Sequence, residues 1–266
     1  MKNRTIFCAA MVLLFTTSAA RAMRLGAEFS GTSWKMDGKD LARDMDYRVA
    51  NSLGSAELKR DKSGMEALLF VEGSSAFRLG LAAGYGRMPK VTYTTMSGAY
   101  SGFMDQGVLE NAASYVPVDL YLKYKKEGGK FSLSVGAGAD FITARTKVSD
   151  NLDSSGSPQA NNHRGTFEQK KTVPHAQAGA EWFIFKWLSL NVRAKYLFGG
   201  VLDELKGNVT GPGAPAGDSR LLMVQGGSGE YLDYQGAGQA LTSGQRPFKY
   251  DFSGLRATVG LRVYFH

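Results

Sequence analysis

Side chains that could act together in catalysis are few in this sequence, and they lie on segments in which polar and apolar residues alternate. His175 and Glu181 have the same parity on one segment, and either could approach Ser132 or Ser134 on a neighbouring segment. A serine with a histidine and a carboxylate can hydrolyse esters, including those of lipids. The parity of these residues turns them away from the apolar side where an acyl chain would lie. We therefore expect no enzyme and assign no catalytic residue.

Sites for cofactors, metals and nucleic acids are not indicated either. Three histidines and one cysteine, Cys8, give no spacing typical of a metal site. Gly136 and Gly138 alternate along a segment instead of opening a helix, which excludes a phosphate-binding loop there. The basic residues are spread along the chain rather than clustered. We predict no cofactor, no metal and no nucleic-acid partner.

A larger set of charged residues shares the polar parity of the alternating segments. Its members carry both signs, and in a narrow closed barrel they would point inward, where unpaired charge is costly. We therefore predict a network of ion pairs that fills the lumen, and the alternative is a solute path in which arginines favour anions. The set comprises Glu28, Glu66, Glu72, Arg78, Asp119, Lys123, Asp140, Glu181, Arg193, Lys195, Arg256 and Arg262.

The alternation itself predicts β-strands, because successive side chains of a strand point to opposite faces. It is strictest in 255–265, where every odd position is apolar and two even positions are arginines. The pattern is least regular in 65–72, where Leu68 and Phe70 interrupt the polar parity. Eight such segments are predicted as strands, at 23–30, 65–72, 77–85, 116–124, 131–141, 175–184, 188–198 and 255–265. Each is about long enough to cross a bilayer at a tilt.

The connections between these segments alternate between short and long. Tight turns are predicted near Gly73, Gly128 and Lys186, and long polar segments at about 35–63, 88–114, 147–170 and 200–249. Short turns on one side and long loops on the other are typical of a bacterial outer-membrane barrel. We predict an all-β, antiparallel, up-and-down transmembrane barrel. Eight strands are expected, and ten are the alternative, since 221–224 and 231–234 could add a hairpin to the last loop.

The N-terminus predicts export. Lys2 and Arg4 precede an apolar stretch from Ile6 to Phe15, and Ala20-Arg21-Ala22 is the small-x-small pattern of a cleavage site. We expect residues 1–22 to be a secretory signal peptide, used by the general secretion pathway and cleaved after Ala22. Residues 23–266 would then form the barrel. Loss of Lys2, Arg4 and Arg21 would lower the formal charge from +8 to +5.

With its signal, its alternating segments and the closing strand Leu255–Phe265, the chain resembles the small bacterial outer-membrane barrels of the OmpA-like, OmpX-like and OmpW-like kind. The resemblance covers the whole predicted mature chain and implies location in the cell outer membrane. It also implies Val263 and Phe265 as an assembly signal read by the barrel-assembly machinery, although His266 follows the phenylalanine. The compact His-x-Ser pattern of outer-membrane lipid A deacylases is absent.

Three functions follow as hypotheses. The first is a structural or surface-interaction protein, whose extracellular loops bind a ligand or mediate adhesion. The second is a narrow channel or carrier for small or hydrophobic solutes, as the OmpW-like resemblance implies. The third is a lipid-modifying enzyme. The expected partners are outer-membrane lipid, lipopolysaccharide, the barrel-assembly machinery and an extracellular ligand of the loops.

Overall fold

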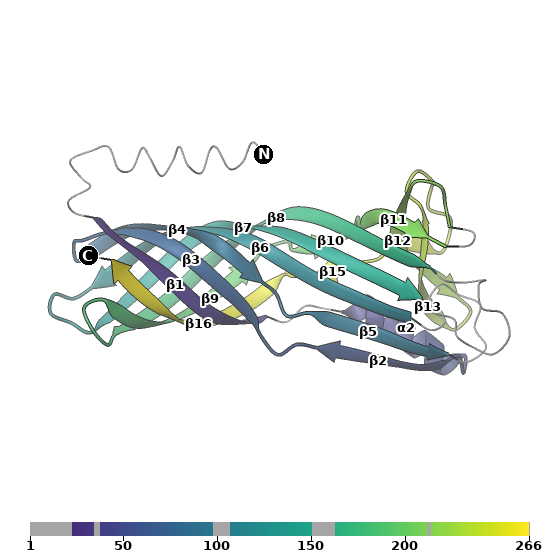
Figure 1. Cartoon of the computed structure of the whole chain (residues 1–266), viewed down its shortest axis with the longest axis horizontal. Coiled ribbons are helices and arrows are strands. Elements are labelled where there is room, and N and C mark those ends of the chain that lie inside the picture. Colours follow the sequence, from purple (N-terminus) through teal and green to yellow (C-terminus); the bar gives the residue numbers. More distant parts are fainter. Residues whose placement is uncertain (1–22, 35–37, 98–106, 151–162, 212–213, 266) are drawn as a thin grey trace.

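The computed structural model describes residues 23–34, 38–97, 107–150, 163–211 and 214–265 (Figure 1). The predicted signal peptide, residues 1–22, lies outside these ranges. The elements are β1 (Met23–Trp34), α2 (Lys39–Ala50), β2 (Gly54–Arg60), β3 (Gly64–Gly73), β4 (Phe77–Arg87), β5 (Val91–Ser97), β6 (Gly107–Lys125), β7 (Phe131–Asp150), β8 (Arg164–Phe183), β9 (Leu188–Leu197), β10 (Val201–Leu202), β11 (Lys206–Thr210), β12 (Asp218–Gly226), β13 (Gly229–Gly236), β14 (Gln245–Pro247), β15 (Tyr250–Asp251) and β16 (Gly254–Phe265).

Eight of these strands close into an antiparallel barrel. The ring runs β1, β3, β4, β6, β7, β8, β9 and β16, and β16 pairs back onto β1, with Glu28 opposite Arg262. Each of the eight predicted strands coincides with one member of this ring, apart from one residue at the end of 175–184 and of 188–198, so the predicted fold class is confirmed. The hairpin expected in the last loop also forms, as β12 and β13. It pairs with β11 and β14 outside the ring, so the strand number is eight rather than ten.

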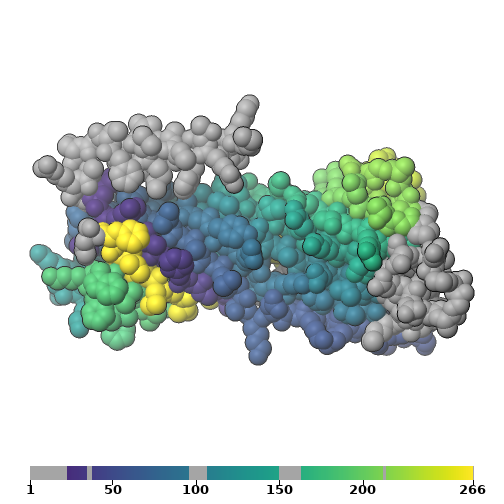
Figure 2. All heavy atoms as spheres, in the orientation of Figure 1, coloured from purple at the N-terminus to yellow at the C-terminus, as the bar shows by residue number. Residues whose placement is uncertain are grey.

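The two ends of the barrel differ. At one end, here called the turn end, short connections join β3 to β4, β6 to β7 and β8 to β9, where turns were predicted, and β1 begins and β16 ends (Figure 1). At the other, the loop end, lie α2, the β2–β5 ladder and the β12–β13 hairpin. The space-filling view shows residues of the 200–249 segment, in light green, at this end (Figure 2).

The segments predicted as polar loops contain much regular structure, and three ring strands continue into them. β7 extends to Asp150, and beyond Phe141 the polarity of its two faces inverts. Ile142 and Val148 are buried inside, whereas Arg145 and Lys147 are exposed outside. A barrel wall in lipid needs apolar residues outside, and a wall in water needs them inside. These extensions were not predicted, because the expected pattern keeps the apolar residues at the same parity along the whole strand.

A helix, α2, packs over the loop end, within the predicted loop at 35–63. Its buried face is charged: Asp44 accepts hydrogen bonds from Arg48 Nε at 2.9 Å, from the backbone N–H of Leu232 at 2.9 Å, and from the hydroxyl of Tyr93. This carboxylate therefore joins the helix to β5 and β13. Three of the four buried residues of α2 are charged, so an expectation that buried helix faces are apolar does not predict this helix.

A second ion cluster fastens the start of α2 to the hairpin. Arg246 lies 2.7 Å from Asp40 and 2.6 Å from Glu230, and Arg43 lies 3.0 Å from Glu230. The hydrogen bond from Arg246 lowers the pKa of Glu230 below its ordinary value of 4.5. Within the described part of the loop end, α2 and the β12–β13 hairpin are therefore cross-linked to each other.

Candidate functional site: the barrel interior

The twelve charged residues predicted for the lumen all lie inside the ring, and none is more than 5% exposed. Six are acidic and six are basic, so their formal charges cancel. They come from all eight strands of the ring: Glu28 from β1, Glu66 and Glu72 from β3, Arg78 from β4, Asp119 and Lys123 from β6, Asp140 from β7, Glu181 from β8, Arg193 and Lys195 from β9, and Arg256 and Arg262 from β16.

Arg193 is the centre of the ion pairs nearer the loop end. Its guanidinium lies 2.6 Å from Glu28, 2.5 Å from Glu66 and 3.2 Å from Asp119. Lys195 adds a second cation at 2.8 Å from Asp119. One arginine thus joins three other strands of the ring, and a single substitution would remove one cation from each of three buried carboxylates.

His175 extends these contacts toward β7. Its Nε2 lies 2.8 Å from Asp119 and its Nδ1 lies 3.3 Å from Asp140. Asp140 is in turn 2.8 Å from Arg256, which also lies 3.4 Å from Glu66. The histidine therefore bridges two carboxylates.

A second group of contacts lies nearer the turn end. Lys123 Nζ is 2.8 Å from Glu72 and also pairs with Glu181. Arg262 lies 2.6 Å from Glu28, and the Tyr264 hydroxyl donates to Glu181 at 2.6 Å. Since Glu28 binds both Arg262 and Arg193, the two groups form one continuous network.

Aromatic rings flank two of the arginines, which the sequence did not predict. The Arg262 guanidinium lies 4.6 Å from the centroid of Phe70 and 5.4 Å from that of Tyr121. Arg256 lies 4.7 Å from the centroid of Trp34 and 4.4 Å from that of Tyr115. Phe70, which interrupts the polar parity of its segment, is thus a ring against which a lumen cation stacks.

Glycines on the inner face make room for these rings. A Cβ on Gly80 would lie 2.3 Å from the ring of Tyr121, and one on Gly86 would lie 2.1 Å from the ring of Tyr115. Each glycine faces its tyrosine across a strand pair, because Gly80 is opposite Tyr121 and Gly86 is opposite Tyr115. Large and small residues thus alternate across the narrow interior.

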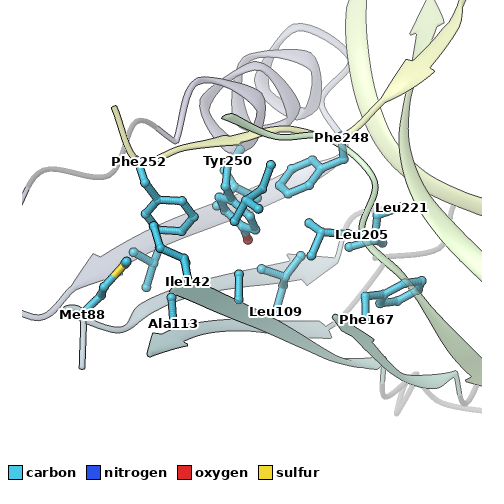
Figure 3. Close-up of a cluster of buried hydrophobic side chains, with 14 of the residues drawn as sticks. Met88, Leu109, Ala113, Ile142, Phe167, Leu205, Leu221, Phe248, Tyr250 and Phe252 are labelled. Atoms are coloured by element: carbon cyan, nitrogen blue, oxygen red, sulfur yellow. The ribbon is translucent and has the colours of Figure 1, made fainter. Parts of the chain in front are cut away.

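Above the charged network, toward the loop end, the interior is apolar. Phe248, Tyr250 and Phe252 enter from the last long segment and are at most 1% exposed. They pack against inward residues of the continued ring strands, such as Leu109 and Ile142 (Figure 3). The described interior is therefore packed at two levels, by ion pairs and by a hydrophobic core.

The residues considered for ester hydrolysis are not brought together. Ser132 Oγ lies 3.4 Å from Glu181, but His175 pairs across from Gly138, which is six residues from Ser132 and four from Ser134 along β7. At about 3.3 Å per residue these separations are roughly 20 and 13 Å of strand. The three groups therefore cannot act as a nucleophile, a base and an orienting carboxylate.

Within the part of the chain that the structure describes, no three His, Cys, Asp or Glu side chains are grouped so as to hold a metal ion. In the same residues, no helix is both long enough and apolar enough to cross a membrane.

The outer face of the ring is apolar. Leu79 and Leu255 are both 64% exposed, and Val135 is 61% exposed. Exposed aromatic residues flank this belt at both ends, with Phe77, Tyr124, Phe131, Trp182, Phe185, Trp187 and Phe265 toward the turn end and Tyr85, Phe141, Tyr196 and Phe198 toward the loop end. Val263 and Phe265, the predicted assembly signal, lie on β16, and Phe265 is 49% exposed.

No family model and no curated protein matches this chain. Among solved structures, it is similar to the outer membrane protein OprG from Pseudomonas aeruginosa, at 13% identity over 92% of this chain and 95% of that one, with a TM-score of 0.42. It is also similar to a major outer membrane protein from Thermus thermophilus, at 12% identity over 92% of this chain and all of that one, with a TM-score of 0.47. Both of these are outer-membrane proteins.

Proposed function

We propose that the chain is an outer-membrane barrel with a closed lumen, whose cross-linked loop end is displayed outside the cell and interacts with ligands or surfaces there. The observation that supports this proposal is the combination of an apolar outer belt with an interior filled by buried ion pairs and apolar side chains. Contact with lipid requires the apolar outer belt. A filled interior leaves the outer surface and its loops as the place where a ligand can bind.

The proposed location in the outer membrane can be tested directly. An apolar belt with aromatic residues at both borders is typical of barrels in an outer membrane. Expression in an outer-membrane host should place the protein in the outer-membrane fraction, and it should migrate faster in unheated than in heated detergent gels. Recovery in the soluble periplasmic fraction would contradict the proposal.

The channel hypothesis is weaker because both the ion network and the apolar core would have to move aside to open a path. Purified protein in planar bilayers is therefore expected to give no discrete conductance. The matched variant for the same bilayer measurement is Arg193→Ala, which removes the cation that joins Glu28, Glu66 and Asp119. Stable openings in the unaltered protein would refute a closed lumen.

Surface interaction is tested at the loop end itself. Tyr47 of α2 and Tyr231 of β13 stack with their ring centroids 5.0 Å apart, and neighbouring Val49 is 74% exposed. Cells that display the protein should attach to at least one member of a panel of glycans and matrix proteins. Val49→Asp should weaken that attachment, while the same amount of protein remains on the cell surface. Equal attachment by cells without the protein would rule out this role.

A further inference from the structure

The turn end carries an excess of positive charge outside the lumen network. Five cations and one carboxylate, Glu127, lie there among the described residues, so this end has a net formal charge of +4. None of these six belongs to the twelve lumen residues. We call the five cations the basic collar. They are Arg24, Lys125, Lys126, Lys130 and Lys186.

Neighbouring strand ends bring the collar together. Three of its cations lie in or beside the β6–β7 turn, and Lys186 lies in the β8–β9 turn (Figure 1). The two turns adjoin, because the backbone N–H of Phe183 donates to the carbonyl of Lys130 at 2.8 Å. Arg24, near the start of β1, is close enough to act on Lys125 electrostatically. The positive charge is therefore concentrated at one end of the barrel wall.

The protein does not neutralise this charge itself. Among the described residues, no carboxylate forms an ion pair with a collar cation. The Lys125 ammonium lies over the ring of Phe183, 3.4 Å from its centroid, and has Arg24 and Arg78 as neighbours of like charge. Like charges held close together repel one another, so an anion from outside would stabilise this end of the barrel.

The height of the collar identifies the layer in which that anion would lie. Lys186 lies between Phe185 and Trp187, exposed aromatic residues at the border of the apolar belt whose rings stack with centroids 5.6 Å apart. Lys126 follows Tyr124, another border residue, by two positions. At about 3.3 Å per residue and a tilt of roughly 40°, Lys126 is about 5 Å beyond that border. The headgroup layer is about 5–8 Å thick on each side of the hydrocarbon core, so both lysines lie within it.

We propose that Lys126 and Lys186 bind the phosphate of a phospholipid with a net negative headgroup in the periplasmic leaflet. This inference rests on the proposed function, which places the loop end outside the cell and therefore the turn end in that leaflet. A lipid whose acyl chains lie against Phe185 and Trp187 would hold its phosphate beside Lys186, whereas free phosphate has no such second contact. A zwitterionic headgroup gains less, because its own cation offsets the charge of its phosphate.

The test measures which lipid lies against the turn end when the protein is in vesicles. Trp182 and Trp187 are 57% and 49% exposed at this end, whereas Trp34, the third tryptophan, is buried. Bromine atoms on a lipid acyl chain quench tryptophan fluorescence on contact. Two vesicle preparations contain equal amounts of phosphatidylglycerol and phosphatidylcholine, and they differ only in which of the two lipids carries the bromine. Stronger quenching by brominated phosphatidylglycerol would report its enrichment beside the collar.

The expected preference follows from the charge of one lysine. A cation near an anionic lipid surface contributes roughly fivefold in affinity, so phosphatidylglycerol should be preferred about fivefold. Lys126→Gln/Lys186→Gln should lower this preference to less than about twofold, because at roughly 0.15 M salt the more distant collar cations are largely screened. The matched variant Lys147→Gln/Arg164→Gln removes the same charge from exposed positions on the outer wall of the loop end and should keep the preference.

A preference for phosphatidylglycerol that is lost in the turn-end variant alone would support the proposal. Equal quenching by the two brominated lipids, a preference that survives in the turn-end variant, or equal losses in the two variants would overturn it. A preference that is abolished by millimolar inorganic phosphate, but not by chloride at the same ionic strength, would assign the collar to free phosphate. Failure of the proposed function is distinct from these outcomes, because a protein that does not enter the bilayer would be quenched by neither lipid.

Discussion

Replacement of Arg262 by leucine tests the charged network most directly. Arg262 is 4% exposed, lies 2.6 Å from Glu28 and stacks on Phe70 and Tyr121. Removal of one partner of a buried ion pair costs roughly 3–5 kcal/mol, because the remaining charge keeps its desolvation penalty. Arg193 still neutralises Glu28 in part, so we expect a loss near the lower value, about 3 kcal/mol.

The assay is equilibrium unfolding by guanidinium of the protein folded in lipid vesicles, followed by tryptophan fluorescence. Lys130→Leu, a charge-to-leucine change on an exposed turn, serves as the control and should lie within about 0.5 kcal/mol of the unaltered protein. Arg262→Lys keeps the charge but loses the planar stacking, and should fall between the two. If Arg262→Leu matched the control, the interior charges would not be a cohesive network, and the argument for a closed lumen would lose its main support.

Three further predictions concern packing and the loop end. Gly80→Ala should destabilise the barrel by about 1–3 kcal/mol in the same unfolding assay, because the added Cβ meets the Tyr121 ring, whereas Gly227→Ala, which has open space around it, should not. Tyr93→Phe removes a hydrogen bond to the buried carboxylate of Asp44 and should cost about 1–3 kcal/mol, seen as faster protease cleavage in α2 with the barrel intact. Acidification from about pH 6 to about pH 3 should increase hydrogen exchange in α2. The folded-state pKa of Glu230 lies below its unfolded-state pKa, so ionised Glu230 stabilises the fold at pH values above the unfolded-state pKa. This stabilisation is lost as the pH falls through the folded-state pKa. Unchanged hydrogen exchange in α2 would contradict this prediction.

The ring of eight strands could be predicted because each spanning segment keeps one apolar parity along its whole length. The inward position of all twelve charged residues follows from the same parity. Their partners do not, since contacts such as Arg193 with Glu66 depend on how strands far apart in sequence meet across the lumen. The pairing of Gly80 with Tyr121 likewise needs the register between β4 and β6, which no local pattern provides.

The loop end could not be predicted for a different reason. Its strands reverse the polarity of their faces near Phe141, so a search for outward apolar residues ends there. Its helix buries Asp44 and Arg48, which pair with each other at 2.9 Å, and Asp44 also accepts hydrogen bonds from Tyr93 and from the backbone of Leu232. A sequence pattern that treats charge as a mark of exposure assigns such a helix to solvent.

The reversal near Phe141 also relates the barrel's architecture to its function. Where the outer face of the barrel wall is apolar, the inner face is polar, and the twelve charged residues there cancel one another's formal charge. Where the outside is polar, apolar residues fill the inside, and Phe248 and Phe252 complete that core. Each level thus packs the interior by its own chemistry, and the border between the levels marks where the polarity of the outer wall changes. In the proposed function, a ligand would bind to the polar outer wall beyond this border.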